Sequence, residues 1–400
     1  MMAMLRAAEV KPDVWWVGGI DWNERNFHGY TTERGSTYNA YLILDEKTTL
    51  VDTCKGGFAQ EMMERIRTII DPAEISYIIA NHVEMDHSGA LPVVAKACPN
   101  AQIVCSSPQG LKGLSAHYGE NFNFLPVKSG ATLSIGKRTL QFVHTPMVHW
   151  PDNMVTYSAY DKVLFSNDAF GQHFASSKRF DDEVGLPEVM AQAKKYYANI
   201  VMPYGKNVRA ALDGLAGLEF DMIAPSHGVI WRSHVKDVLE KYALWCSGEA
   251  EEYALVIYDS MWHTTEAMAR AITEAFMEVG IPARLFDLKA NHMSDIMTEV
   301  LSARYIAVGS PTLNKQMMPT VAAFLCYMKG LAPEGRVGIP FGSYGWMQAG
   351  PKDVAAALEA CKFQLPCGVI THQWVETPEG LDAVRDAVMA AIGPLHDEAR

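Results

Sequence analysis

Beyond about residue 250, the chain alternates strictly between short apolar segments and amphipathic segments with helical periodicity. The apolar segments predict strands at 254–258, 282–288, 304–310, 336–343 and 368–371. The amphipathic segments predict helices at 265–279, 293–302, 319–329, 351–361 and 378–392. Because these strands are largely apolar along their length, both of their faces should be buried, as in a parallel sheet covered by helices on each side. This part of the chain therefore predicts a doubly wound α/β domain.

Residues 1–250 follow a different pattern, in which many short apolar segments are separated by turns and helices are fewer. Strands are predicted at 37–44, 48–52, 76–80, 102–105, 140–145, 154–159, 162–166 and 222–226. Helices are predicted at about 58–70, 88–97, 187–200, 207–216 and 233–248. Such a mixture is typical of an α+β layered sandwich. The change of pattern predicts a first domain of residues 1–250 and a second of residues 251–400.

Composition excludes several classes of protein. The 400 residues include 46 acidic and 34 basic side chains, and the net charge of −12 argues against nucleic-acid binding and against docking on an anionic membrane surface. No segment approaches the roughly 18 apolar residues of a membrane span, and we expect no signal peptide. The seven cysteines form no C-x-x-C pair, which excludes a four-cysteine metal module and indicates reduced thiols in a cytoplasmic protein.

Four potential metal ligands lie within six consecutive residues directly after the predicted strand 76–80. They are His82, Glu84, Asp86 and His87. Alternation along an extended chain places His82 and Glu84 on one side, and the chain then turns, so that this single segment can contact two metal ions. The alternative is a solvated polar turn in which Asp86 caps a helix.

Three further potential ligands each follow a predicted strand. They are His149, Asp168 and His227. A carboxylate in the position of Asp168 can bridge two metal ions, because it has two oxygens to share. The sequence therefore predicts a dinuclear metal site in which each ion has two or three protein ligands besides the bridge.

A hydroxyl-bearing loop joins the strand 254–258 to the helix that follows it. Such a loop suits a phosphate group, since backbone N–H groups, the helix dipole and hydroxyls all favour an anion. The absence of a G-x-G-x-x-G motif and of a lysine P-loop argues against a dinucleotide and against ATP. The alternative is simple helix capping by Ser260 or Thr264. The expected binding residues are Ser260, Met261, Trp262, His263, Thr264 and Thr265.

The loops after the third and fourth strands of the second domain carry glycine and aromatic residues that can enclose a flat isoalloxazine ring. Trp346 could stack on this ring or reach the metal site of a neighbouring subunit, and the alternative is an ordinary buried tryptophan. The residues expected to line the ring are Pro311, Thr312, Leu313, Asn314, Ser343, Tyr344, Gly345, Trp346, Gln348 and Gly350.

The motif H-x-E-x-D-H, followed in order by His149, Asp168 and His227, resembles the metallo-β-lactamase superfamily. Hydrolases of that superfamily usually have histidine in the position of Glu84, and a carboxylate there favours iron over zinc. With its second domain, the chain is similar over essentially its whole length to the flavodiiron proteins, also called A-type flavoproteins or rubredoxin:oxygen oxidoreductases. The resemblance implies an α+β metallo-β-lactamase-like αββα sandwich followed by an α/β flavodoxin-like doubly wound domain.

The resemblance also implies a division of the ligands between two non-haem irons. One iron would be held by His82, Glu84, His149 and Asp168, and the other by Asp86, His87, His227 and again Asp168. It further implies a pocket lined by Phe27, His28, Gly29, Tyr30, His173 and Tyr197. His28 and Tyr197 are candidate proton donors, and the alternative is that they are hydrogen-bonded core side chains. His117, His144 and His234 are assigned no role beyond supporting the ligands.

The first loop of the second domain resembles the S/T-x-T-G-x-T pattern of short-chain flavodoxins, which implies FMN rather than FAD. Trp262 and His263 replace the usual Thr and Gly of that pattern. The departure is typical of the flavodoxin domains of flavodiiron proteins.

The activity implied by the resemblance is reduction of O2 to water, of NO to N2O, or of both, in the cytoplasm of an anaerobe. Electrons would pass through FMN from a small carrier, rubredoxin being the first candidate, and Lys315 could attract an acidic one. A head-to-tail homodimer, or a dimer of such dimers, is also implied, because it would bring the flavin of one chain to the irons of the other. The alternatives are a dinuclear zinc hydrolase with an accessory flavodoxin domain, and a non-catalytic electron carrier with a vestigial first domain.

Overall fold

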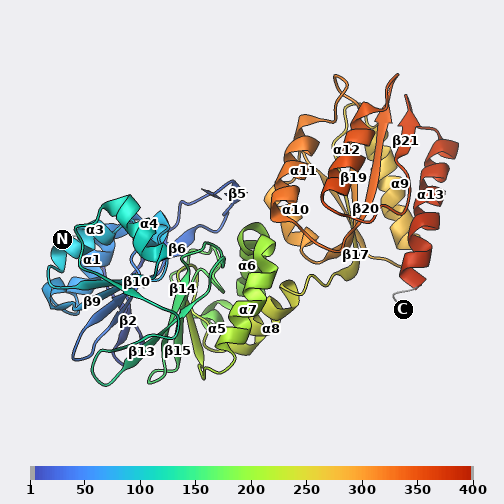
Figure 1. Ribbon diagram of the computed structural model, residues 1–400. Coiled ribbons are helices and arrows are strands. Elements are labelled where there is room, and N and C mark those ends of the chain that lie inside the picture. The colour runs from blue at the N-terminus through green and yellow to red at the C-terminus, as the bar shows by residue number, and fades with distance from the viewer. Residues whose placement is uncertain (1–4, 398–400) are drawn as a thin grey trace. The chain divides into compact units, whose positions relative to one another are not determined.

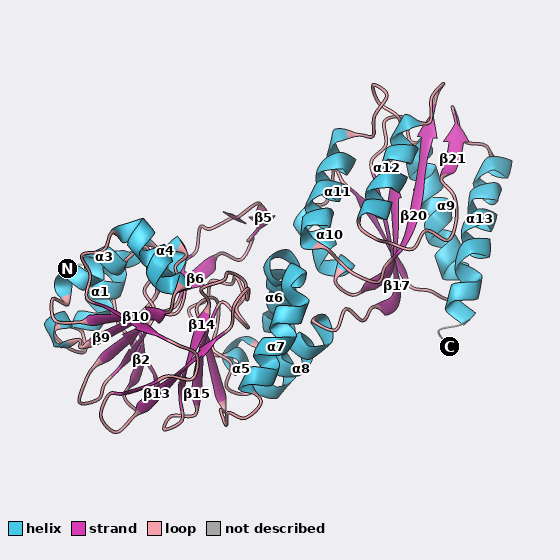
Figure 2. Cartoon of the chain, viewed as in Figure 1, coloured by secondary structure: helices cyan, strands magenta, loops and turns pink. Residues whose placement is uncertain are grey.

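The computed structural model describes residues 5–397, which form two compact units. Within the described residues, the first consists of residues 5–196 with Tyr204–Ala243, and the second of Tyr197–Pro203 with residues 244–397 (Figures 1 and 2). Within the described residues, no helix combines the length and the apolar character needed to cross a membrane.

Two β-sheets packed face to face form the centre of the first unit. The seven-stranded sheet has the order β1-β2-β7-β8-β9-β10-β11 and the five-stranded sheet the order β12-β13-β14-β15-β16. The strands of the first sheet are β1 (Ala8–Lys11), β2 (Val14–Trp16), β7 (Tyr41–Ile43), β8 (Thr49–Val51), β9 (Tyr77–Ala80), β10 (Gln102–Ser106) and β11 (Phe124–Val127). Those of the second are β12 (Thr132–Ser134), β13 (Thr139–His144), β14 (Met154–Ser158), β15 (Val163–Asn167) and β16 (Met222–Pro225).

Apolar side chains from both sheets form the core between them. Ile79 and Val104 of the first sheet belong to the same buried cluster as Leu140 and Phe142 of the second. Leu140 and Phe142 are two residues apart, so they share the inner face of β13, while Gln141 between them points to the other face and is only partly buried. Full burial of side chains of this size stabilises the fold by roughly 1.5–3 kcal/mol each.

Helices cover the outer faces of the two sheets, which completes an αββα sandwich (Figure 2). A second buried cluster joins the outer face of the first sheet to α1 and α3 through Met62, Ile78 and Leu91. The helices of this unit are α1 (Ala59–Arg67), α2 (Met85–Ser88), α3 (Leu91–Ala97), α4 (Gln109–Tyr118), α5 (Asp181–Val184), α6 (Leu186–Tyr196), α7 (Gly205–Leu215) and α8 (Val235–Trp245). The predicted fold of the first domain is confirmed.

Several elements of this unit were absent from the sequence-based prediction. The short strands have too few residues to show an alternating pattern, and the two glycines of α4 lower its helical propensity. The predicted strand 37–44 is divided between β6 (Ser36–Tyr38) and β7, which lie in different sheets. The unpredicted elements are β1, β2, β3 (Gly19–Asp21), β4 (Asn26–Phe27), β5 (Tyr30–Thr31), β11, β12, α4 and α5.

The second unit contains a five-stranded sheet in the order β18-β17-β19-β20-β21, in which every neighbouring pair is parallel. Buried clusters fill both faces of this sheet, one against α9 and α13 and the other against α10, α11 and α12. The predicted doubly wound fold is therefore confirmed. The strands are β17 (Glu251–Tyr258), β18 (Ala283–Asp287), β19 (Ala303–Gly309), β20 (Val337–Tyr344) and β21 (Ile370–Gln373). The helices are α9 (Thr264–Glu278), α10 (Met293–Val300), α11 (Pro319–Leu331), α12 (Ala349–Ala360) and α13 (Pro378–Asp397).

The strand order places a topological switch point between β17 and β19, because the chain leaves these neighbouring strands toward opposite edges of the sheet. Ligands of open α/β sheets bind outside the carboxyl ends of the strands at such a point. The loops that begin at Asp259 and Ser310 follow β17 and β19 there, and the loop after β20 lies next to them.

Candidate metal centre and flavin cleft

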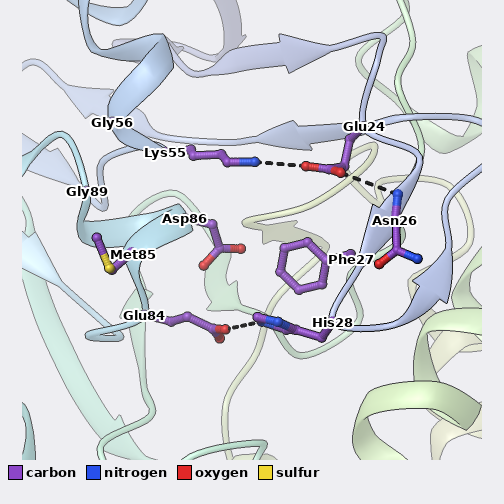
Figure 3. A pocket seen from close by; sticks show the side chains of 10 residues that line it. All are labelled: Glu24, Asn26, Phe27, His28, Lys55, Gly56, Glu84, Met85, Asp86 and Gly89. Carbon is purple, nitrogen blue, oxygen red and sulfur yellow. Dashed lines mark hydrogen bonds and ion pairs between the residues drawn. The ribbon is translucent and has the colours of Figure 1, made fainter.

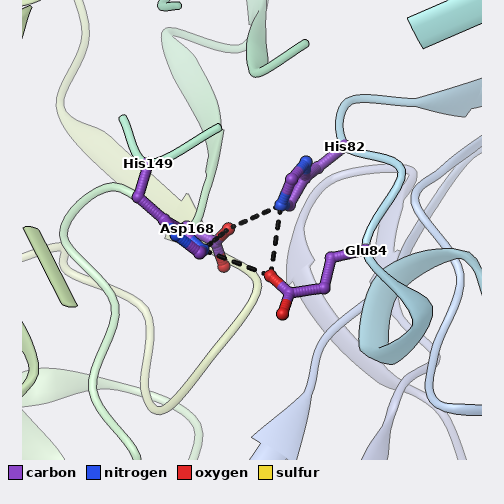
Figure 4. A group of neighbouring side chains, drawn as sticks. All are labelled: His82, Glu84, His149 and Asp168. Carbon is purple, nitrogen blue, oxygen red and sulfur yellow. Dashed lines mark hydrogen bonds and ion pairs between the residues drawn. The ribbon is translucent and has the colours of Figure 1, made fainter. Parts of the chain in front are cut away.

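The seven predicted metal ligands lie together in two buried groups. One group consists of His82, Glu84, His149 and Asp168, and the other of Asp86, His87 and His227. Within each group, one potential ligand atom per residue lies within 4.8 Å of the others. Figure 4 shows the first group, with its side chains converging from different parts of the chain. The two groups contain the residues of the two predicted sets, with Asp168 assigned to the first group alone.

The segment that supplies four of these side chains changes conformation within a few residues. β9 ends at Ala80, and the buried carboxylate of Asp52 accepts hydrogen bonds from both nitrogens of Asn81, at 2.8 Å and 3.0 Å. His82 and Glu84 follow in the loop, and the short helix α2 then carries Asp86 and His87. The turn into this helix separates His82 and Glu84 from Asp86 and His87.

Asp168 lies between the two groups, and each of its oxygens faces one of them. Its Oδ2 atom lies 3.5 Å from Nε2 of His82 and 3.5 Å from Nε2 of His149. Its Oδ1 atom lies 2.9 Å from Nε2 of His87 and 3.4 Å from Nε2 of His227. This is the arrangement that a bridging carboxylate requires.

Several buried polar atoms of these side chains have no hydrogen-bond partner in the described part of the chain, and metal ions could bind them instead. Both carboxylate oxygens of Asp86 and Asp168, and Nε2 of His87, lack a hydrogen-bond partner of suitable geometry among the described residues. Leaving such an atom buried costs roughly 1–3 kcal/mol, and more when it is charged. The donors are imidazole nitrogens and carboxylate oxygens without a thiolate, a set that suits iron. The residues present therefore fit a dinuclear metal site.

Some of these side chains have pKa values far from their usual ranges. Burial alone would lower the pKa of His227, but the nearby carboxylates of Asp168 and Asp86 raise it to about 10. Burial alone would raise the pKa of Asp168, but the nearby imidazoles of His87 and His227 lower it well below its usual range. Without an ion, the cluster consists of histidine–carboxylate pairs, so metal binding should release protons.

Groups behind the ligands fix the orientation of two histidine rings. Nδ1 of His82 lies 2.9 Å from Oδ2 of Asp152, which also accepts a hydrogen bond of 2.8 Å from the backbone N–H of Val83. Nδ1 of His227 lies 2.7 Å from the carbonyl oxygen of Thr37. Such partners set the tautomer that leaves Nε2 free to bind a metal. Asp152 was missed in the sequence, although it lies three residues after His149 in an H-W-P-D-N segment.

A cavity of about 380 Å³ reaches the buried carboxylates (Figure 3). His28 is at its edge, in the turn between β4 and β5, and its Nε2 atom lies 2.6 Å from Oε1 of Glu84. The hydrogen bond with Glu84 raises the pKa of His28, against the effect of burial. The lining residues are Glu24, Asn26, Phe27, His28, Lys55, Gly56, Glu84, Met85, Asp86 and Gly89.

His173 and Tyr197, the other candidates near the metal groups, have different positions. The ring of His173 is buried 4.6 Å from that of His227, and burial lowers the pKa of His173 well below its usual range. The ring of Tyr197 instead packs 5.3 Å from that of Trp245. The preceding residue, Tyr196, is the tyrosine that faces the metal groups, with its ring 6.0 Å from that of His227.

The three histidines without a predicted role have local contacts. His117 packs against the ring of Tyr118, His144 lies 3.1 Å from the carbonyl oxygen of Val127, and His234 lies 3.0 Å from Asp237.

The second unit has a separate cleft of about 290 Å³ at the carboxyl ends of β17, β19 and β20. All but one of its lining residues were predicted from the sequence; Trp374, which directly follows β21, was missed. Trp346 is 83% exposed and its ring lies 6.1 Å from that of Trp374, so the alternative of an ordinary buried tryptophan is wrong. The lining residues are Met261, Trp262, Thr264, Pro311, Thr312, Ser343, Tyr344, Gly345, Trp346 and Trp374.

Buried hydroxyls lie at the base of the loop that leads into α9. Oγ of Ser260 is buried and lacks a hydrogen-bond partner among the described residues, so it is able to donate to a phosphate. Oγ1 of Thr265 lies 2.8 Å from Oγ of Ser343, so these two hydroxyls join the first turn of α9 to the end of β20. The loop and the first turn of α9 therefore fit an anionic group.

The remaining predicted residues of the cleft have structural contacts. His263 has a left-handed backbone, with φ of 71°, and its ring lies 3.0 Å from Glu266. Gln348 donates a hydrogen bond of 3.4 Å to Thr371. A Cβ atom at Gly350 would lie 2.5 Å from the carbonyl oxygen of Pro311, so glycine is needed for the close approach of these loops. Leu313 exchanges backbone hydrogen bonds with Gln316 around Asn314, which has a positive φ.

Comparison with known proteins relates both halves of the chain to known families. Residues 37–228 match the ODP family beta lactamase and residues 256–387 match Flavodoxin. The nitric oxide reductase of Moorella thermoacetica is 42% identical over 388 residues, covering 96% of each chain. The rubredoxin-oxygen oxidoreductase of Megalodesulfovibrio gigas is 43% identical over 367 residues, or 90% of this chain and 91% of that one.

Solved structures resemble the chain over nearly its whole length. The rubredoxin oxygen:oxidoreductase of Desulfovibrio gigas has a TM-score of 0.96 at 40% identity, covering 98% of this chain and 100% of that one. The flavodiiron protein of Giardia intestinalis has a TM-score of 0.94 at 36% identity, covering 98% of this chain and 97% of that one.

Proposed function

The chain belongs to the flavodiiron proteins and is an oxidoreductase, and we propose that it reduces O2 to water, NO to N2O, or both, at a non-haem di-iron centre that receives electrons through FMN. The first domain, residues 1–250, holds the irons and the second, residues 251–400, holds FMN. The single observation that carries the proposal is the position of Asp168, whose two oxygens each face one group of buried ligands.

The proposed metal ligands are the seven side chains predicted from the sequence. Glu84 and His149 complete the first group, and the carboxylate of Glu84 favours iron over the zinc of the related hydrolases. When bound by these side chains, two ferrous ions would supply electrons to a diatomic oxidant and polarise it. Reduction of O2 to two waters takes four electrons, so the centre must be refilled during turnover, and a one-electron carrier such as FMN meets that need.

Side chains of the cavity admit the substrate and supply protons. Phe27 gives the cavity an apolar wall that suits an uncharged diatomic molecule. The side chain of His28 is 63% exposed and its Nε2 atom contacts Glu84, so His28 can exchange a proton between solvent and the edge of the metal site. His173 has a lowered pKa and stays neutral, which avoids placing an additional positive charge beside the proposed metal ligand His227.

The cleft of the second domain holds FMN. Ser260 and the amino-terminal turn of α9 would hold its phosphate, while Tyr344, Trp346 and Trp374 would pack against its isoalloxazine ring. The exposure of Trp346 supports a further role at a contact with another molecule, such as a second copy of the chain in a head-to-tail homodimer. A small carrier, rubredoxin first among the candidates, delivers the electrons, as the name of the relative from M. gigas indicates for that protein. All seven cysteines are free thiols, which supports a reducing, cytoplasmic location.

The test combines a metal count with an activity assay. Protein purified without added metal should contain about two irons and one FMN per chain, and it should consume O2 or NO when supplied with reduced rubredoxin. Two zincs with little iron, together with hydrolysis of a thioester, lactam or phosphodiester, would contradict the proposal. Size determination on the same sample tests the homodimer, since an active monomer would exclude it.

A further inference from the structure

A buried carboxylate lies at the base of the loop that is proposed to bind the FMN phosphate. Asp259 directly follows β17 and is 1% exposed. Its Oδ1 atom accepts a hydrogen bond of 2.6 Å from the N–H of Ser260, and its Oδ2 atom accepts one from the hydroxyl of Thr320. A phosphate bound at the next residue would meet this negative charge in a poorly solvated place, where repulsion between like charges is strong.

Lys289 is positioned to compensate for that charge. Its ammonium lies 3.3 Å from Oδ1 of Asp259 and donates a hydrogen bond of 2.7 Å to the carbonyl oxygen of Ser260. Among the described residues, it is the one basic side chain within ion-pair distance of Asp259. One ammonium group thus balances the buried carboxylate and holds the first peptide of the loop.

The backbone near Lys289 is itself anchored to the sheet. The N–H of Leu288 donates to the carbonyl oxygen of Tyr258 at 2.9 Å, and the N–H of Lys289 donates to Oδ1 of Asp287 at 2.8 Å. Because β17 and β18 pair directly, the end of β18 brings Lys289 beside the loop that follows β17. The position of the ammonium is therefore set by the fold, although the side chain is 53% exposed.

We propose that Lys289 is a positioning residue for FMN, which cancels the charge of Asp259 and holds the Ser260 peptide so that the Ser260 hydroxyl faces the phosphate. The proposal rests on the proposed function, in that FMN must bind at this loop. It makes two claims that can be separated by experiment. The effect of Lys289 depends on the phosphate of the ligand, and it depends on the negative charge of Asp259.

The first claim is tested with two flavins. Flavin-depleted full-length protein is titrated with FMN and with riboflavin, which has the same ring without the phosphate, and flavin fluorescence gives the dissociation constants. Lys289→Met should weaken FMN binding by about 10-fold, which is less than the loss at a fully buried charge pair because the Lys289 side chain is 53% exposed. It should change riboflavin binding by less than about 2-fold. The matched control is Lys352→Met, which removes an exposed lysine of α12 and should leave both constants within about 2-fold.

The second claim is tested with a double-mutant cycle. In an Asp259→Asn background there is no buried charge to balance, so Lys289→Met should weaken FMN binding by less than about 3-fold. Lys289→Arg keeps the charge and should retain most of the affinity of the parent protein.

Each other outcome has a defined meaning. If Lys289→Met weakens FMN and riboflavin equally, Lys289 supports the cleft as a whole and the proposal is wrong. If FMN binding is unchanged by Lys289→Met, the ion pair has no effect on the cofactor and the proposal is also wrong. If the parent protein binds neither flavin, the proposed function itself fails, which is a different result. Should Asp259→Asn fail to fold, the comparison of FMN with riboflavin still decides the first claim.

Discussion

Nδ1 of His82 and Oδ2 of Asp152 lie 2.9 Å apart, and both side chains are buried. The carboxylate selects the tautomer in which Nε2 of His82 faces the metal group. Asp152→Asn should therefore weaken iron binding by about 10- to 100-fold, the usual effect of losing such a partner. A competition titration of Fe(II) against a chelator measures this. Asp182→Asn, at an exposed carboxylate of the same unit, serves as the control, and equal affinity in both variants would exclude the orienting role.

Asp168→Ala should remove both metal ions, because Asp168 is the side chain that faces both ligand groups. FMN content should stay at the level of the parent protein, since the flavin cleft is built from residues of the second unit alone. Plasma mass spectrometry and the flavin absorbance give the two contents. Retention of full iron content would contradict the bridging role.

Ser260→Ala combined with Thr265→Ala should weaken FMN binding without changing iron content. The Ser260 hydroxyl is buried and unpaired, so its removal costs a direct contact with the phosphate of about 1–2 kcal/mol, or roughly 10-fold in affinity. Thr265 contacts Ser343, so Thr265→Ala alone should have the smaller effect. Fluorescence titration of the flavin-depleted single and double variants measures these effects. Unchanged flavin occupancy in the double variant would mean that the phosphate binds elsewhere.

Glu33 should stabilise the first unit in a pH-dependent way through Lys195. Partial burial alone would raise the pKa of Glu33, but hydrogen bonds with Lys195 and Thr31 lower it to about 2. Because this is below the value of about 4.3 in an unfolded chain, the stabilisation is fully present above about pH 5 and is lost as the pH falls toward 2. The Glu33 side chain is 56% exposed, so solvent screening limits the effect to less than about 1 kcal/mol.

Thermal unfolding of the parent protein and of Glu33→Gln should reveal this effect as a difference in midpoint. The difference should be largest near pH 7 and should shrink below about pH 4. A difference that grows as the pH falls would have the wrong sign and would rule out this ion pair as its source.

The proposed ligand set was predictable from sequence because each member lies in a loop that follows a predicted strand, or in the short helix to which such a loop leads. Asp152 was not, because its role depends on which side chain lies behind His82, and they are 70 positions apart in the chain. The predicted helix 187–200 changes to a π-helical turn at Tyr197. That turn alters the rotation per residue, so periodicity could not tell which of Tyr196 and Tyr197 faces the metal groups.

In the flavin cleft, too, the sequence predicted the residues that follow the regular pattern of strands and missed one that does not. The residues that follow β17, β19 and β20 were predicted because the doubly wound pattern places these loops together. Trp374 follows the short strand β21 and has a left-handed backbone, with φ of 61°. No feature of the sequence around it marked that conformation.

The proposed metal ligands follow strands of both sheets of the sandwich, and the last of them in the chain is His227. During synthesis, the imidazoles and carboxylates of the earlier segments therefore emerge before the site that selects among metals exists. Until the sheets close, their affinities follow the intrinsic order of the ions, in which zinc and copper exceed iron. Whether the protein binds iron or zinc should thus depend on whether the two sheets pack together before or after the ligands meet metal ions. Refolding in a mixture of Fe(II) and Zn(II) should yield more zinc-loaded protein than adding the same mixture to the folded apoprotein, and equal loading by both routes would exclude this kinetic control.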